Sequence, residues 1–222
     1  MAQGATYDVI ITGGRIVDGS GAPWFTADVG IVGGRIVRVG ALAGVTATRR
    51  VDATGLVVAP GFIDPHAHAR ERLFDLPTAE GYLLQGITTV VDGNDDSSPL
   101  PVAPYLARAA AAHFSPNVAL FVGHGTVRDQ VMGSANRKAT PAELDSMKAL
   151  VATAMREGAL GLSTGLAYVP GTFAPTDEVV ALSAVARDFG GIYTSHMRDE
   201  GGGVIASVQE TIRIGEEARI AV

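Results

Sequence analysis

From residue 56 onward the chain alternates short apolar runs with segments of helical pattern, and this alternation limits its fold more than any other feature. The apolar runs are residues 56–64, 88–93, 117–125, 160–165 and 191–196. Nearly continuous apolar runs are typical of strands that are buried on both faces of a parallel sheet. Strands that alternate with helices predict parallel βαβ units. We therefore expect an α/β fold in this part of the chain.

The segments between these strands predict helices over residues 78–86, 101–114, 140–158, 176–191 and 201–219. Thr140 is expected to cap the third helix, because Pro141 and Glu143 follow at the first and third helical positions. Thr176 is expected to cap the fourth helix in the same way. Five strands, with residues 220–222 as the start of a sixth, predict about five to six units of a (β/α)8 TIM barrel. Eight such units typically take about 250 residues, so we expect the chain to end within the barrel. A doubly wound open sheet is the alternative, although no G-x-G-x-x-G sequence follows the first strand.

The first 58 residues predict strands and turns, because they show no helical period. Alternating residues on both sides of Gly33 and Gly34 predict a two-residue hairpin, and residues 49–60 add two more strands. A β unit of this size cannot readily bury both faces of its sheet. We therefore expect a small β domain over residues 1–58 and a truncated barrel over residues 59–222.

Charge and composition exclude several classes of partner. The net charge is −6 over 222 residues, so nothing favours a nucleic-acid partner. No run of 18 or more apolar residues predicts a transmembrane helix, and the N-terminus lacks the pattern of a signal peptide. The absence of cysteine excludes disulfides and thiolate metal ligands. We expect a cytoplasmic protein without a membrane partner.

His66 and His68 follow the first apolar run and are separated by one residue. On an extended backbone, residues i and i+2 project to the same face. Both imidazoles can therefore reach one point just past the end of a strand. This arrangement suits Zn²⁺, which takes neutral imidazole ligands. Two unrelated surface histidines are the alternative, because H-x-H is common by chance.

Polar residues also gather at the ends of the other predicted strands, where the active site of a TIM barrel lies. They are Asp64, Asp92, Asn94, Asp95, Asp96, His124, Ser163, Thr164, His196, Arg198, Asp199 and Glu200, with Tyr168 in a following loop. Four of the five histidines lie at strand ends. His113 is the exception and is expected to interact with the last carbonyls of its helix. The clustering predicts the site of a metal-dependent hydrolase.

The motifs that carry these residues resemble a known family. VVAPGFIDPHAH, residues 57–68, is similar to the opening signature of the amidohydrolase superfamily, whose members are metal-dependent hydrolases on a (β/α)8 barrel. LSTGLAYVPG (162–171) and SHMRDE (195–200) are more specific and resemble the N-acyl-D-amino-acid deacylase (D-aminoacylase) group. The resemblance implies hydrolysis of the amide bond of an N-acyl-D-amino acid, which is a small-molecule substrate.

The resemblance also implies roles for single residues. His66, His68 and His196 correspond to metal-binding histidines of the family, and we expect one or two Zn²⁺ ions. The family commonly has a metal-binding cysteine where this chain has Asp95. A carboxylate can replace a thiolate on Zn²⁺ and would make the site more tolerant of Mn²⁺ or Fe²⁺. A simple polar turn is the alternative for Asp95, and a bond to a backbone carbonyl is the alternative for His196. Tyr168 is expected to hold the carboxylate of the substrate.

Three further residues carry weaker expectations. Arg198 is expected to bind the substrate or to pair with Asp199 or Glu200. Asp64 is expected to orient the histidines or to support their loop. His124 is expected to pack, or to orient a ligand, rather than to bind metal.

The resemblance implies that part of the family's site lies beyond Val222. The general base of the family is an aspartate after the eighth strand, another histidine ligand follows the sixth, and C-terminal strands complete a composite β-sandwich. The catalytic residue of this chain is therefore unknown. We expect the 222-residue chain to be inactive alone, and to aggregate or to need a complementing C-terminal fragment.

Two other functions stay open at this point. One is a cyclic-amide hydrolase of the dihydroorotase or hydantoinase type, and the other is a truncated homologue without catalysis. The sequence leaves the acyl group, the side-chain preference, the metal and the oligomeric state open.

Overall fold

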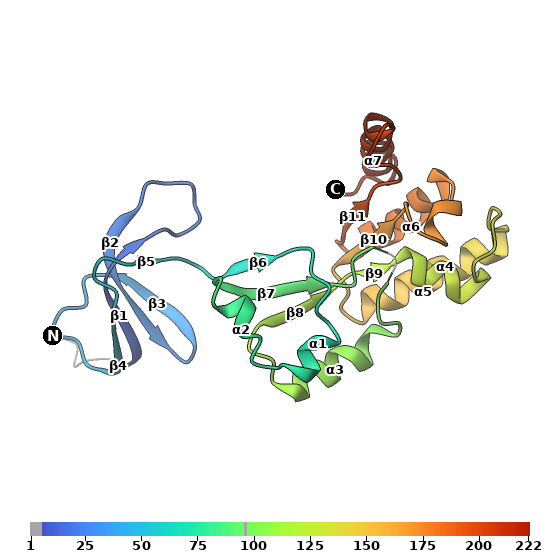
Figure 1. The fold of residues 1–222 in the computed structure, drawn as a ribbon. Coiled ribbons are helices and arrows are strands. Elements are labelled where there is room, and N and C mark those ends of the chain that lie inside the picture. Colours follow the sequence, from blue (N-terminus) through green and yellow to red (C-terminus); the bar gives the residue numbers. More distant parts are fainter. Residues whose placement is uncertain (1–5, 96) are drawn as a thin grey trace. The chain divides into compact units, whose positions relative to one another are not determined.

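The computed structural model describes residues 6–95 and 97–222. The chain divides into two compact units, Met1–Gly61 and Phe62–Val222, called here the β unit and the α/β unit (Figure 1). The sequence put this division slightly earlier, after residue 58. Asp96, which the sequence grouped with the strand-end residues, lies outside the described residues.

The β unit is a five-stranded sheet. Its strands are β1 (Tyr7–Ile16), β2 (Phe25–Val32), β3 (Arg35–Gly40), β4 (Ala47–Asp52) and β5 (Val57–Val58). β2 pairs antiparallel with both β1 and β3, while β4 and β5 pair with β1 in parallel. Residues 6–61 contain no helix, as the sequence predicts.

The predicted hairpin at Gly33 and Gly34 is confirmed. Val32 pairs with Arg35 across the two-residue loop. Both glycines have positive φ, 58° and 72°, as a type I′ turn requires. This turn has the backbone twist that matches the two flanking strands, so the glycines fix the register of β2 and β3.

The core of the β unit is small. Tyr7, Ile10 and Leu42 pack together as a buried cluster. Ile36 and Val37 of β3, in contrast, are 66% and 56% exposed. The sheet therefore leaves apolar side chains in water, which agrees with the expectation that so short a segment cannot cover both of its faces.

Residues 62–95 and 97–222 of the α/β unit contain six short strands that all pair in parallel. They are β6 (Phe62–Asp64), β7 (Ile87–Asp92), β8 (Asn117–Leu120), β9 (Val122–Gly123), β10 (Gly161–Gly165) and β11 (Ile192–His196). β6, β7 and β8 form one sheet, and β9, β10 and β11 form another. These strands agree with the apolar runs of the sequence, apart from their exact ends.

β8 and β9 act as one interrupted strand that links the two sheets. Only Phe121 separates them, and its N–H donates to the Asp92 carbonyl of β7 at 2.8 Å. On the other side, the Leu160 N–H donates to the Leu120 carbonyl at 2.7 Å. Neighbouring strands therefore follow chain order from β6 to β11. A doubly wound sheet requires a reversal of strand order, so the doubly wound alternative is wrong.

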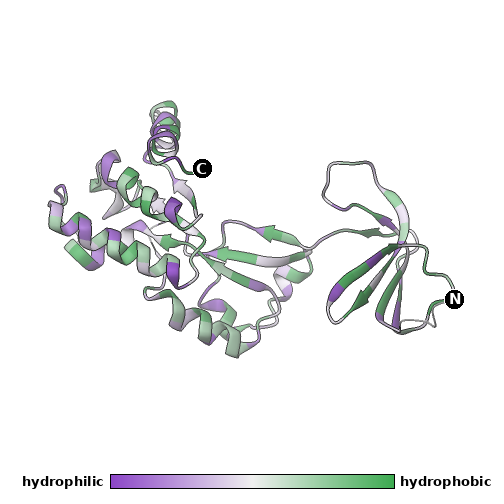
Figure 2. Ribbon diagram, turned by 180° about the vertical axis from the view of Figure 1, so that it is seen from behind, coloured by the Kyte–Doolittle hydropathy of each residue, from purple (hydrophilic) through white to green (hydrophobic). Residues whose placement is uncertain are grey.

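Helices separate these strands along the chain. They are α1 (Arg72–Asp75), α2 (Glu80–Leu83), α3 (Val102–Ala112), α4 (His124–Met132), α5 (Pro141–Arg156), the 3₁₀ turn η1 (Gly171–Phe173), α6 (Thr176–Asp188) and α7 (Val204–Ala218). The main apolar core lies between the strands and α3, α5, α6 and α7. Figure 2 shows hydrophobic residues along the strands and on parts of these helices. No helix within residues 6–95 and 97–222 is both long and apolar enough to cross a membrane.

The helix starts show where local patterns succeed and where they fail. Thr140 caps α5 with a complete capping box to Glu143, as predicted. For Thr176 the prediction is wrong, because Pro175 is the N-cap and Thr176 is the first residue of α6. The Thr176 hydroxyl instead donates to Glu210 of α7 at 2.8 Å, so a long-range partner takes its hydrogen bond.

The sequence also missed one helix and overestimated another. Residues 117–125 were expected to form a single strand, but the strand ends at Gly123 and α4 begins at His124. The predicted helix over 78–86 is reduced to the four residues of α2. At the other end, Ile220 to Val222 form no assigned strand, yet the Ala221 carbonyl accepts the Tyr193 N–H of β11 at 2.8 Å. A further parallel strand that followed β11 would make the same hydrogen bond.

Candidate metal centre

Several of the predicted strand-end residues come together at one edge of the α/β unit. Asp92 and His196 are the last residues of β7 and β11. His66 and His68 lie in the loop after β6, and Asp95 follows β7. Because parallel strands end at a common edge, the loops that leave them meet there.

His66, His68 and Asp95 form a compact cluster of ligand atoms. The two Nε2 atoms are 3.2 Å apart. One Asp95 oxygen lies 3.6 Å from His66 Nε2, and the other lies 3.4 Å from His68 Nε2. Four ligands held tetrahedrally at 2.0–2.1 Å from Zn²⁺ are about 3.3 Å apart. The spacing therefore fits three ligands of a single ion.

Unsatisfied polar atoms support this fit. Asp95 Oδ1 is buried and has no hydrogen-bond partner among the described residues. A buried carboxylate oxygen without a partner is costly. The two facing Nε2 atoms of His66 and His68 also need a proton or a cation between them. A divalent cation in this position would satisfy all three side chains, so the residues present fit a metal ion.

A tight turn with positive φ angles at Gly93 and Asp95 orients the Asp95 carboxylate. Gly93 has φ of +77°, and a Cβ at this position would lie 2.3 Å from the Phe121 carbonyl oxygen. Asp95 itself has φ of +61°, which an aspartate tolerates better than most residues. Its N–H donates to Ser163 Oγ of β10 at 2.8 Å. Two neighbouring strands therefore fix the turn, and Asp95 points toward the histidines as predicted.

His196 lies on the other side of Asp95. Its Nδ1 is 3.9 Å from Asp95 Oδ1. Within the described residues, His196 does not belong to the group in which all ligand atoms lie within 4.8 Å of one another. The Tyr168 hydroxyl is 3.3 Å from both ring nitrogens of His196, and the two rings meet edge to face. The Asp95 carboxylate thus lies close to ring nitrogens of all three histidines, at 3.6, 3.4 and 3.9 Å.

Asp64 supports the histidine loop through the backbone. Its Oδ1 accepts the His66 N–H at 3.2 Å, so it stabilises the turn that leaves β6. His124, in contrast, is not beside these ligands. It is fully buried at the start of α4, where its Nε2 lies 2.9 Å from Glu178 Oε1. Of the two predicted roles for His124, the contacts of the described residues correspond to packing.

Arg198 is engaged in a structural network. It forms a two-pronged ion pair with Glu210 of α7, with N–O distances of 2.9 and 3.0 Å. It also donates to the carbonyls of Thr172 and Ala174, at 3.0 and 3.1 Å. Within the described residues its ionic partner is therefore neither Asp199 nor Glu200, which corrects the predicted pairing. Most of its donors are used, so few are available to a substrate.

No pattern in the sequence indicates the partner of Arg198. Glu210 lies on the face of α7 that packs toward α6, where it also accepts the Thr176 hydroxyl. Burial alone would raise the pKa of Glu210, but hydrogen bonds from Arg198 and Thr176 lower it below its ordinary value. Glu210 is thus ionised and anchors Arg198 to the helix.

A second buried charge network was also missed. Arg128 of α4 is fully buried and bonds both oxygens of Glu178 of α6, at 2.6 and 2.7 Å. Burial would raise the pKa of Glu178, whereas hydrogen bonds from His124 and Arg128 bring it below its ordinary value. Glu178 comes in the first turn of its helix, where an acidic residue is common in any case, so its burial could not be read from its position.

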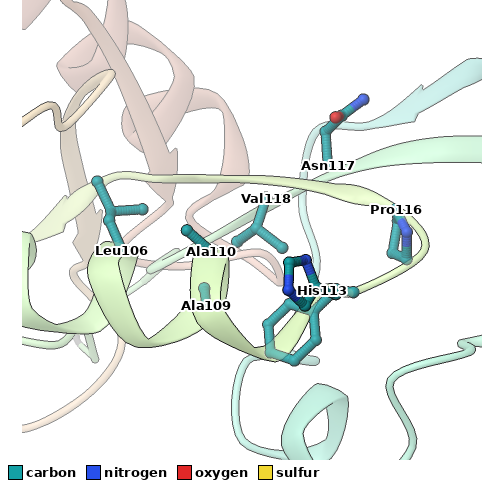
Figure 3. A pocket seen from close by; sticks show the side chains of 8 residues that line it. Leu106, Ala109, Ala110, His113, Pro116, Asn117 and Val118 are labelled. Carbon is teal, nitrogen blue, oxygen red and sulfur yellow. The ribbon is translucent and has the colours of Figure 1, made fainter.

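Several hollows open on the surface of the described part of the α/β unit, among them one beside α3 and one beside His68. The larger, of about 350 Å³, lies between the end of α3 and the start of β8 (Figure 3). His113, which ends α3 with φ of +51°, lines it, but none of the candidate site residues does. The smaller, of about 160 Å³, is lined by His68, Arg70, Glu71, Arg72 and Ser97. The smaller hollow is therefore the one that opens beside a candidate metal ligand, His68.

Comparison with known proteins gives this geometry a context. Residues 49–218 match the model of the Amidohydrolase family. D-aminoacylase of Alcaligenes xylosoxydans xylosoxydans is 38% identical, over 97% of this chain and 49% of that protein. The solved structure of N-acyl-D-glutamate deacylase of Bordetella bronchiseptica, in complex with zinc and a phosphonate inhibitor, is also 38% identical and has a TM-score of 0.93. That match covers 98% of this chain and 50% of the other.

A structure of D-aminoacylase that addresses its binuclear metal centre matches with a TM-score of 0.89 and 38% identity, over 96% of this chain and 50% of that one. The chain therefore spans about half the length of the relatives it matches. Its mixed α/β fold is the fold of that half. Because the family model covers most of the sequence, the chain belongs to the amidohydrolase family.

Proposed function

We propose that this chain is part of a metal-dependent hydrolase that cleaves the amide bond of N-acyl-D-amino acids. The observation that carries the proposal is the cluster of His66, His68 and Asp95 at the carboxyl edge of a parallel sheet, with spacing that suits one ion. The chain order of the strands supports a partial (β/α)8 barrel of about five to six units, preceded by a small β domain.

The proposed centre has two positions that share Asp95. His66, His68 and Asp95 would hold one ion, and His196 lies across the carboxylate, where it would serve a second position. Zn²⁺ suits two imidazoles and a carboxylate. Because a carboxylate is a harder ligand than a thiolate, the centre should also accept Mn²⁺ or Fe²⁺.

The side chains around the centre would perform distinct tasks. A bound divalent ion would lower the pKa of a water molecule and polarise the amide carbonyl. Tyr168 would donate a hydrogen bond to the carboxylate of the substrate, since its hydroxyl is close to His196 and its side chain is accessible. Asp64 would hold the histidine loop. We assign the general base to none of the residues of this chain.

Metal binding tests the proposal directly. The purified chain should bind about one equivalent of Zn²⁺ tightly, at the position formed by His66, His68 and Asp95, measured by competition with a chromophoric chelator. His66→Ala should lose this stoichiometric binding, because two remaining ligands cannot hold the ion. His113→Asn is the matched control, since it removes a histidine at the end of α3 that is not a candidate ligand. Asparagine tolerates the positive φ of that position. Stoichiometric binding by His66→Ala would contradict the site.

The substrate class needs a separate measurement. The assay uses Zn²⁺-loaded protein to which a C-terminal segment with the general-base aspartate has been added. This protein should release acetate from N-acetyl-D-glutamate and not from its L-enantiomer. Opening of hydantoin or dihydroorotate instead would favour a cyclic-amide hydrolase. Metal binding without either reaction would favour the non-catalytic alternative.

A further inference from the structure

Asp92 is a buried carboxylate that accepts four hydrogen bonds from described residues of the α/β unit, and it is not one of the proposed metal ligands. Asp92, the last residue of β7, is fully buried. Its Oδ2 accepts the backbone N–H groups of Ala69 and Arg70, at 2.6 and 2.8 Å. Its Oδ1 accepts the Gly93 N–H at 2.6 Å and Arg70 Nη1 at 3.2 Å. Four donors thus offset the cost of burying this charge.

These donors belong to the two segments that carry the cluster ligands. Ala69 and Arg70 directly follow His68, so Asp92 Oδ2 holds the end of the histidine loop. Gly93 begins the turn that presents Asp95, so Asp92 Oδ1 holds the start of that turn. One rigid carboxylate therefore links the two sets of ligands. Because the two oxygens of a carboxylate are a constant distance apart, Asp92 also limits the distance between the two segments.

Arg70 extends this link to Ser97, which follows Asp95 in the sequence. Besides bonding Asp92, its guanidinium donates to the carbonyl and the hydroxyl of Ser97. The Tyr105 hydroxyl of α3 donates to the Arg70 carbonyl at 3.0 Å. Burial and the negative charge of Asp92 raise the pKa of Tyr105 to about 12, so this hydroxyl keeps its proton and its donor role. The Asp92–Arg70 pair is thus held by the loop after β6, by the segment after β7 and by α3.

We propose that Asp92 is a positioning residue of the metal centre: it holds the His66–His68 loop and the Asp95 turn at the separation that one divalent cation requires. The inference rests on the proposed metal site, and it goes beyond the ligands themselves. Carboxylates that hold ligand segments in place typically account for 10–100-fold of metal affinity. Arg70 holds the Asp92 carboxylate in its orientation through the bond from Nη1 to Oδ1.

Asp92→Asn tests this role with little change in volume. An amide keeps one acceptor oxygen but turns an N–H₂ group toward the donors that Asp92 now satisfies. The readouts are the Zn²⁺ dissociation constant, from chelator competition, and the absorption spectrum of the Co²⁺-loaded chain. Asp92→Asn should weaken Zn²⁺ binding about 10–100-fold at unchanged stoichiometry, and it should alter the Co²⁺ ligand-field bands because the ligand geometry relaxes.

Glu178→Gln is the matched control. Glu178 is also a buried, ion-paired carboxylate of the α/β unit, but its partners His124 and Arg128 carry no ligand of the cluster. This variant should keep Zn²⁺ affinity within about twofold of the wild type, even where its thermal stability falls. Equal losses of Zn²⁺ affinity in Asp92→Asn and Glu178→Gln would show a merely structural role and overturn the inference.

Two results separate this inference from the proposed function. If the wild type binds Zn²⁺ and Asp92→Asn binds it equally well, the positioning role is wrong and the metal site stands. If the wild type binds no Zn²⁺, both fail. Should Asp92→Asn not fold, Arg70→Lys serves in its place: it keeps the charge but loses the two-point contact to Ser97. Its Zn²⁺ affinity should fall several-fold, and unchanged affinity would overturn the inference.

Discussion

At the scale of single residues, the centre depends on Asp95, because this carboxylate lies between the histidine pair and His196. Its oxygens point in two directions, and one of them is buried without a partner. An alanine at this position would leave the two imidazoles at 3.2 Å without a third ligand. A cysteine would instead supply a softer ligand from the same turn.

We therefore predict opposite outcomes for two substitutions of Asp95. Asp95→Ala should lower Zn²⁺ affinity by at least about 100-fold, while Asp95→Cys should retain it and shift selectivity from Mn²⁺ toward Zn²⁺. The Co²⁺-loaded Cys variant should show a thiolate-to-metal charge-transfer band in the near ultraviolet. Unchanged Zn²⁺ affinity in Asp95→Ala would mean that Asp95 is only a polar turn residue.

At the scale of the elements, buried and partly buried charges join segments that are distant in sequence. Glu178 of α6 receives hydrogen bonds from His124 and Arg128 of α4. Arg198, two residues after the end of β11, is joined to Glu210 of α7 and to the loop after β10. Removing one partner of such a buried pair typically costs about 3–5 kcal/mol, because it leaves the other charge unpaired.

The Glu178 network predicts a pH-dependent stability. The pKa of Glu178 is lowered in the folded protein, so its stabilisation is complete above the unfolded value of about 4.3. It is lost as the pH falls through the folded pKa. The wild type should therefore exceed Glu178→Gln in unfolding free energy by about 3 kcal/mol at pH 7, and this difference should shrink below pH 4. Urea unfolding at several pH values measures it.

An exposed glutamate provides the control for this prediction. Glu216 of α7 is exposed and forms no ion pair with any described residue. Glu216→Gln should differ from the wild type by less than about 0.5 kcal/mol at neutral and acid pH. A difference between Glu178→Gln and the wild type that does not depend on pH would contradict the ionised role of Glu178.

At the scale of the whole molecule, large apolar side chains are exposed on a helix and on an edge strand of the α/β unit. On α7, Ile205, Val208 and Ile212 are 70%, 39% and 50% exposed, and their spacing puts them on one face of the helix. On the edge strand β6, Phe62 and Ile63 are more than 60% exposed. Contiguous exposed apolar surface is a site of association, and an unpaired strand edge is another.

We accordingly predict that the isolated 222-residue chain associates at micromolar concentration. The double variant Ile205→Lys with Ile212→Glu should shift the population toward monomer in sedimentation equilibrium, because it removes apolar area without changing the net charge. Gln209→Lys changes the charge of the same helix without removing apolar area and should leave association nearly unchanged. A wild type that is monomeric under these conditions would contradict the prediction.

Much of the architecture was predictable because it depends on neighbours in sequence. The apolar runs predict the strands, Gly33 and Gly34 predict the hairpin, and the Thr140 capping box predicts the start of α5. The H-x-H spacing likewise places two imidazoles on one side of a single segment. In each case the interacting atoms lie within a few residues, so local geometry decides the outcome.

The sequence by itself determined the α/β pattern, the family resemblance and the residues that could bind metal. Only the tertiary structure decided their partners: Asp95 beside both histidines, Arg198 on Glu210, and His124 on Glu178. These pairs are joined across 12 to 54 residues of chain. The reason is that a side chain's partner depends on which strand ends and helix faces the fold brings together, and no periodicity along the chain encodes that distance.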